Sequence, residues 1–143
     1  MKLTSINIGV EREASATLAV ATGIYKAPAQ GPVEIRTLGI PTDVIVDVKH
    51  HGGVDQAIYI YTAEDYAWWS QELGRELPPG VFGENLTIAG LESAPALAGD
   101  RLQIGEVTLE VTCPRMPCRV FAARMGDPHF IERFRAGERP GLY

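Results

Sequence analysis

Short segments separated by glycine and proline turns are the feature that most limits the fold of this chain. The sequence holds 15 glycines and 10 prolines in 143 residues. Several stretches between them alternate apolar and polar residues, a pattern typical of half-buried strands. We predict eight short strands over residues 3–10, 17–22, 33–38, 44–48, 57–61, 81–88, 101–104 and 107–111. Because no βαβ alternation is present, a mainly β fold with a barrel-like core is expected.

Three short helices interrupt this β pattern. The first follows a capping-box-like start, in which Thr62 precedes Asp65, and glycine at Gly74 provides its stop. Trp68 and Trp69 are adjacent and cannot share one helix face, so we expect one to pack and the other to be partly exposed. Two further helices are predicted over residues 120–125 and 128–136.

Length and composition favour one folded domain over residues 1–143. Hydrophobic residues make up 45% of the chain and charged residues 22%, which suits a globular protein. No apolar run reaches the ~20 residues of a membrane span, and no secretory signal is visible. We therefore expect a cytoplasmic protein with reduced thiols. A net charge of −5 argues against general nucleic-acid binding.

Both cysteines lie in one segment, Thr112-Cys113-Pro114-Arg115-Met116-Pro117-Cys118-Arg119. The segment joins a predicted strand to a predicted helix, and nearby cations and helix amides favour a thiolate. Residues 113–143 carry six arginines and three acids, whereas residues 1–112 carry seven basic and fifteen acidic residues. This basic end suits a compact anionic ligand. The alternatives are a solvated arginine face and two buried, inert thiols.

A second segment, Lys49-His50-His51-Gly52-Gly53, combines cationic side chains with two glycines. Glycine amides approach an anion closely, so this segment is a candidate anion cradle, and a tight turn is the alternative. Adjacent histidines on a strand face opposite sides, so at most one is expected to enter a site. Asn85 is a candidate for orienting a ligand or a histidine, with a β-bulge role as its alternative.

These residues allow two chemical arrangements to be considered, a zinc site and a nucleophilic Cys–His pair. A zinc site would draw its ligands from His50 or His51, Cys113, Cys118 and His129, but these spacings match no zinc pattern. A nucleophilic pair of Cys118 with His51 or His50 is open at this level, because it depends on geometry.

Four motifs together resemble the MOSC domain, the molybdenum cofactor sulfurase C-terminal domain, in its small free-standing bacterial form. They are Lys49-His50-His51-Gly52-Gly53-Val54-Asp55-Gln56-Ala57, Phe82-Gly83-Glu84-Asn85-Leu86, Gly99-Asp100 and Pro114-Arg115-Met116-Pro117-Cys118. The resemblance implies a MOSC-type β-barrel-like fold. Members of the family commonly continue past the position of Gly141 with a strand that closes the barrel, so we expect this domain to lack that strand or to close differently.

The resemblance also implies that Cys118 ligates the molybdenum of molybdopterin or carries sulfur as a persulfide. The expected cofactor shell is Lys49, His51, Gly52, Gly53, Asn85, Arg115 and Arg119. Pyridoxal phosphate binding is a further expectation from the family, and Cys113 has no assigned role.

Three functions follow as expectations. The first is a molybdenum-dependent oxidoreductase that reduces a small N-hydroxylated substrate, with Cys118 as metal ligand and a separate electron-donor protein. The second is a sulfur carrier with a Cys118 persulfide, and the third is a non-enzymatic anion-binding module. No membrane or nucleic-acid partner is expected, and a homodimer is one alternative for the assembly.

Overall fold

A four-stranded sheet forms the centre of the computed structural model, which describes residues 1–143. Its strand order is β4-β1-β6-β5, with β1 antiparallel to both neighbours and β5 parallel to β6. Two small antiparallel ladders, β2-β3 and β7-β8, accompany the sheet. The strands are β1 Lys2–Gly9, β2 Arg12–Glu13, β3 Ala21–Thr22, β4 Lys26–Pro28, β5 Ile60–Thr62, β6 Leu86–Ala89, β7 Arg101–Ile104 and β8 Val107–Glu110.

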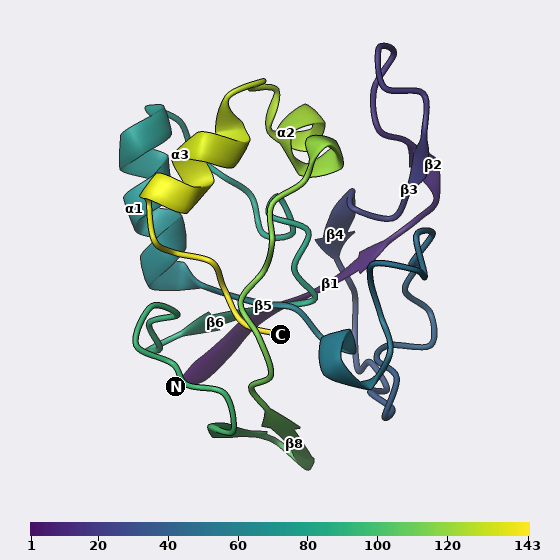
Figure 1. The fold of residues 1–143 in the computed structure, drawn as a ribbon. Helices are drawn as coiled ribbons and strands as arrows, with labels where there is room; N and C mark the ends of the chain where they lie inside the picture. Colours follow the sequence, from purple (N-terminus) through teal and green to yellow (C-terminus); the bar gives the residue numbers. More distant parts are fainter.

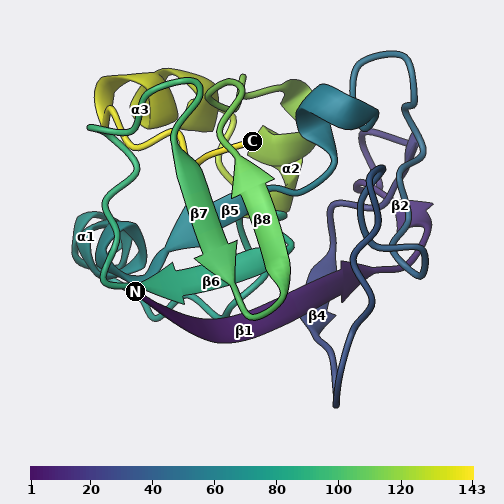
Figure 2. The ribbon, with the colours of Figure 1, turned by 90° about the horizontal axis from the view of Figure 1, so that it is seen from below.

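Three helices gather on one side of this sheet, and the β7-β8 hairpin lies on the other side (Figure 1). Figure 2 shows the hairpin crossing in front of β6 and β1. The helices are α1 Ala63–Leu73, α2 Arg119–Met125 and α3 Phe130–Ala136, with a 3₁₀ turn, η1, at Val54–Gln56. None of the helices has the length and apolar character needed to cross a membrane.

The ends of α1 are set by local sequence, as predicted. The Thr62 hydroxyl accepts a hydrogen bond from the Asp65 backbone N–H at 3.0 Å, which satisfies one of the free donors of the first turn. Gly74 ends the helix in the left-handed conformation, with φ of 63°. The ends of α2 and the β7-β8 hairpin also match the predicted ranges closely, because caps and turns depend on neighbouring residues.

Two hydrophobic clusters cover the two faces of the sheet. Alternation along the β5 segment sends Tyr59 and Tyr61 into an aromatic cluster beside the helices, and Ile58 and Ile60 into an aliphatic cluster. Trp69 is buried in the aromatic cluster, where its indole N–H donates to the Tyr61 hydroxyl at 2.8 Å. Its neighbour Trp68 is partly exposed, so the prediction for this pair is confirmed.

The Glu84 carboxylate anchors the loop that precedes β6. It is fully buried, and Oε1 accepts hydrogen bonds from the Tyr66 hydroxyl at 2.6 Å, the Gly80 N–H at 2.7 Å and the Thr87 hydroxyl at 2.8 Å. Burial raises the pKa of this carboxyl, although these donors act in the opposite direction. The loop is thereby fixed against α1 and β6.

The mainly β, barrel-like prediction is confirmed only in part. The fold is mixed, with 20% helical and 23% strand residues, and its sheets are not closed into a barrel. Residues 44–48 form no strand and residues 33–38 form only an isolated bridge from Arg36 to Gly39. Both segments alternate apolar and polar residues as strands do, but no neighbouring strand pairs with them. The predicted strands 17–22, 57–61 and 81–88 are also shorter or shifted, as β3, β5 and β6.

Candidate functional site

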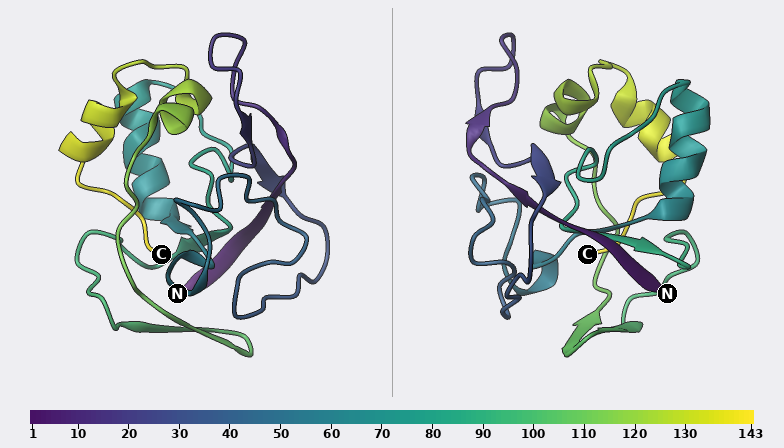
Figure 3. Two further views of the ribbon diagram at one scale, coloured as in Figure 1. Left: turned by 45° about the vertical axis from the view of Figure 1, so that its right-hand side comes forward. Right: turned by 180° about the vertical axis from the view of Figure 1, so that it is seen from behind.

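A cavity of about 660 Å³ lies where several loops meet beside the start of α2. The β2-β3 arm and the long loop between β4 and β5 lie side by side on this part of the molecule (Figure 3). Most of the lining comes from three stretches, within residues 18–26, 43–56 and 115–120, although not every residue of these stretches takes part. Tyr59, Gly83, Asn85 and Tyr143 complete the lining. The cysteine segment, the histidine segment and Asn85, which are distant in sequence, therefore border one space.

Cys118 lies on the wall of this cavity immediately before α2 and is half-buried. Burial alone would raise the pKa of its thiol, but His51, the backbone N–H groups of Phe121 and Val120, and the charge of Arg115 outweigh burial and lower the pKa to about 7. A large fraction of Cys118 is therefore thiolate at neutral pH, the form that binds metals and attacks electrophiles.

Arg115 is a buried cation in the same wall, with 6% of its surface exposed. Its guanidinium lies between two aromatic rings, 4.8 Å from the Tyr59 centroid and 4.3 Å from the Phe121 centroid. One terminal nitrogen donates to the Phe82 carbonyl at 2.7 Å, but Nε is buried without a partner. No carboxylate pairs with this charge, and the charge of Arg115 is one of the causes that lower the pKa of Cys118.

Gly83 makes room for this arrangement. Its φ is 76°, and a Cβ built there would lie 3.3 Å from the Arg115 guanidinium nitrogen and 2.8 Å from Ile24 Cγ1. A side chain at this position would strain the backbone and crowd the arginine. Phe82-Gly83-Glu84-Asn85 is thus a structural support of the cavity, in addition to supplying Asn85.

A buried polar network that sequence analysis did not predict forms another part of the wall. Asp43 accepts hydrogen bonds from the Gly9 N–H and the Asn85 side-chain amide, both at 2.8 Å, and pairs with the Lys26 ammonium. Asn85 in turn accepts from the Tyr59 N–H at 3.1 Å. Burial is the main cause that lowers the pKa of Lys26. The position of Lys26 in a turn-rich segment was the only visible signal, and nothing in the sequence indicated its partner.

The histidine segment divides between the cavity and solvent. His51 and Gly52 line the cavity, whereas Lys49 and Gly53 are exposed and lie outside its lining. The His50 ring borders the cavity but is held at the surface by Asp47, with Nδ1 2.9 Å from a carboxylate oxygen. Gly52 and Gly53 both have positive φ, 81° and 79°, so this segment is a turn rather than the end of a strand.

The remaining candidate residues divide into those that line the cavity and those that lie outside it. Arg119 lines the cavity and is exposed, and Asn85 is buried within the network described above. Cys113 and His129 are not part of the lining, and both cysteines are free thiols. No three histidine, cysteine or acidic side chains converge on a point where they would hold a metal ion.

These residues fit a metal that arrives with its own ligands, as in an organic metal cofactor. One soft thiolate, Cys118, is available for the metal. The volume lies within the range of small-molecule sites. Two buried polar atoms in the lining residues, Arg115 Nε and Gln56 Oε1, have no hydrogen-bond partner, as expected for groups that meet a polar ligand. For pyridoxal phosphate there is no comparable support, because the buried lysine of the cavity, Lys26, is already paired with Asp43.

Similarity to other proteins agrees with this site. The profile of the MOSC domain family matches residues 47–143. The chain is 35% identical over 124 residues to the uncharacterized protein YflK of Bacillus subtilis, covering 87% of this chain and 56% of YflK. It is 30% identical over 118 residues to a protein named reductase from Gibberella moniliformis, covering 80% of this chain and 21% of that protein.

The fold is also similar to that of a solved relative. The crystal structure of YiiM from Geobacillus stearothermophilus superimposes with a TM-score of 0.75 and 29% identity, covering 97% of this chain and 64% of that one. The chain thus spans little more than half of YflK and a fifth of the fungal reductase. The profile match includes the histidine segment, Asn85 and Cys118, and on these grounds the chain belongs to the MOSC domain family, which is associated with the molybdenum cofactor.

Proposed function

We propose that this protein holds a molybdenum cofactor in the Cys118 cavity and reduces small N-hydroxylated compounds. The observation that carries the proposal is a half-buried thiol with a pKa of about 7 on the wall of a cavity that also contains a buried, unpaired cation. Membership of the MOSC family and similarity to a protein named reductase support the same function.

Each lining residue has a role that follows from its place. The Cys118 thiolate ligates the metal, and His51 and Arg115 keep this sulfur deprotonated. Arg115 and Arg119 supply positive charge for the anionic groups of molybdopterin, and Gly52 and Asn85 line the same space. The Lys26–Asp43–Asn85 network holds the wall rigid around them.

When bound, the cofactor supplies the two-electron redox chemistry that protein side chains lack. Reduction of an N–OH group to N–H releases water and consumes two electrons and two protons. The electrons come from a separate electron-donor protein, and the protons come from solvent through the open side of the cavity. The protein's own contribution is to hold the metal through Cys118 and to enclose the substrate beside it.

The metal content of the purified protein tests this proposal. From a host that makes the molybdenum cofactor, the wild type should contain close to one molybdenum per chain. Cys118→Ala should lose nearly all of it, because no other side chain of the cavity supplies a thiolate. Cys113→Ala is the matched control and should keep the metal, since this thiol is outside the lining.

Two results would contradict the proposal. Wild-type protein that carries sulfane sulfur on Cys118 but no molybdenum would instead indicate sulfur transfer. Wild-type protein that carries neither, with Cys118 alkylated no faster than a model thiol at neutral pH, would indicate an anion-binding module.

A further inference from the structure

Gln56 is one of two cavity residues that have a buried polar atom without a hydrogen-bond partner. It ends the 3₁₀ turn η1 between the histidine segment and β5, and it lines the Cys118 cavity. Its side-chain Oε1 is buried and has no hydrogen-bond partner. A buried acceptor that is left unpaired is destabilising, so such an atom in a native cavity calls for a partner that the chain itself does not supply.

The second unpaired atom in the cavity is a donor. Arg115 Nε is buried, and the guanidinium plane is fixed between the Tyr59 and Phe121 rings with one terminal nitrogen already bonded to the Phe82 carbonyl. Because these contacts hold the guanidinium plane in place, Nε has no acceptor from the protein. An acceptor on a bound ligand would satisfy it. Two residues of the cavity lining thus each keep one buried polar atom without a protein partner, an acceptor on Gln56 and a donor on Arg115.

Several other polar groups of the wall already have protein partners. Lys26, Asp43 and Asn85 satisfy one another and the backbone N–H groups of Gly9 and Tyr59, while His50 is held by Asp47. A ligand with both kinds of group would therefore meet Gln56 and Arg115 rather than the network.

We propose that Gln56 is a ligand-recognition residue whose Oε1 accepts an N–H of the pterin ring, while Arg115 Nε donates to an oxygen of the same ligand. A pterin carries ring and amino N–H donors beside a carbonyl oxygen, so it presents both groups that the wall lacks. This inference rests on the proposed function, because it assigns the organic part of the cofactor to Gln56 and Arg115 of the cavity lining.

Direct binding of a free pterin tests the inference without enzymatic activity. Protein from a host unable to make the cofactor is titrated with pterin-6-carboxylate, and binding is followed by quenching of the pterin fluorescence. Gln56→Leu should weaken binding about tenfold or more, because the buried N–H of the ligand loses its acceptor. Gln56→Glu, which keeps an acceptor, should bind within a few-fold of the wild type.

Gln71→Leu is the matched control, since Gln71 is exposed on α1 outside the cavity, and it should bind as the wild type does. Circular dichroism and urea unfolding establish that each variant is folded. If Gln56→Leu binds the pterin as tightly as Gln71→Leu, or if the wild type does not bind it, the inference is wrong.

The failure of this inference differs from the failure of the proposed function. Protein from a cofactor-competent host is analysed in parallel for molybdenum and for the fluorescent oxidised pterin. If the wild type and Gln56→Leu contain equal amounts of both, the proposed function stands and the role of Gln56 is wrong. A wild type without molybdenum that nevertheless binds pterin through Gln56 would overturn the metal chemistry and retain the recognition.

Discussion

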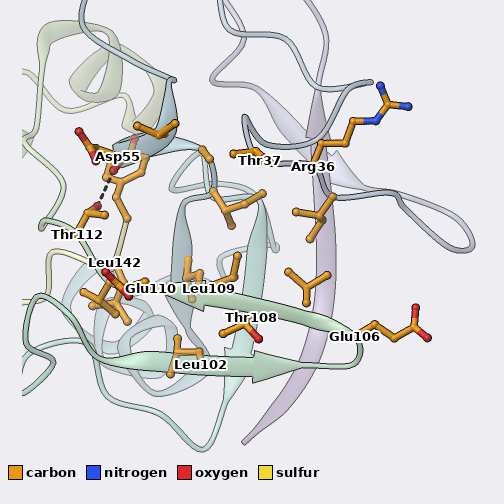
Figure 4. A pocket seen from close by; sticks show the side chains of 18 residues that line it. Arg36, Thr37, Asp55, Leu102, Glu106, Thr108, Leu109, Glu110, Thr112 and Leu142 are labelled. Atoms are coloured by element: carbon orange, nitrogen blue, oxygen red, sulfur yellow. Dashed lines mark hydrogen bonds between the residues drawn. The ribbon is translucent and has the colours of Figure 1, made fainter.

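Two hollows of similar size lie in this molecule, and they differ in what their walls contain. The Cys118 cavity measures about 660 Å³, and a groove between the β7-β8 hairpin and the sheet measures about 800 Å³. Figure 4 shows Leu102 and Leu109 of the hairpin beside this groove, with Arg36 and Glu106 at its outer edge. Tyr143 borders both hollows.

Their charged groups are arranged in opposite ways. In the groove, Arg36, Asp55, Glu106 and Glu110 are all exposed. No buried polar side-chain atom of its lining lacks a partner. In the Cys118 cavity, by contrast, Lys26, Asn85 and Arg115 are buried.

The larger hollow is therefore a gap over an aliphatic face, whereas the smaller one is lined by buried polar and charged side chains. Burying charges costs free energy unless they are paired, so buried polar groups identify a site better than volume does.

The largest difference between the two regions should follow from breaking the buried ion pair. Lys26→Met leaves the Asp43 carboxylate buried without its cation and should lower the free energy of unfolding by about 3–5 kcal/mol. Urea unfolding measures this change. The double variant Lys26→Met/Asp43→Asn should recover much of the loss, because it removes both charges. A loss below about 1 kcal/mol for the single variant would mean that this wall is as tolerant as the groove.

An intermediate effect is expected at the thiol itself, and it concerns reactivity rather than stability. His51 helps to lower the pKa of Cys118 to about 7. His51→Ala should raise that pKa, so the thiolate fraction at pH 7 falls and alkylation by iodoacetamide slows by about tenfold. The measurement uses a Cys113→Ala background, in which Cys118 is the sole thiol, across a pH series.

The direction of the pH dependence is fixed by the same shift. In the protein that retains His51, the alkylation rate should rise as the pH increases through about 7, the pKa of Cys118. In His51→Ala the same rise should occur at a higher pH, because the pKa of Cys118 is higher. His50→Ala is the control, since its ring is bound to Asp47 at the surface and should leave the profile unchanged. Identical profiles for all three proteins would show that His51 does not affect the pKa of Cys118.

The smallest effect is expected in the groove. Glu110 pairs with Arg101 at 2.9 Å, but both side chains are more than half exposed. Glu110→Gln should therefore change the free energy of unfolding by less than about 1 kcal/mol and leave Cys118 alkylation as it was. Thermal unfolding and the same alkylation assay check this. A marked change in the reactivity of Cys118 would show that the two hollows are coupled, with Tyr143 as the shared residue.

The sequence alone determined the local features of this protein, namely helix ends, turns and short motifs. The cap at Thr62, the stop at Gly74, the α2 segment and the β7-β8 hairpin follow from residues a few positions apart, so they could be predicted. The motifs around His51, Asn85 and Cys118 likewise indicated the MOSC family, to which the chain belongs.

Only the tertiary structure decided which segments paired and which side chains met. Val44 to Val48 alternates like a strand, yet it pairs with no neighbouring strand, and residues 44–47 line the cavity instead. Asp43 meets Lys26 from 17 residues away and Asn85 from 42 residues away, and no local pattern encodes such contacts. The same long-range packing buried Arg115 between two rings and left Gln56 without a partner. Side-chain burial and pairing depend on the whole fold, whereas caps and turns depend on a few consecutive residues.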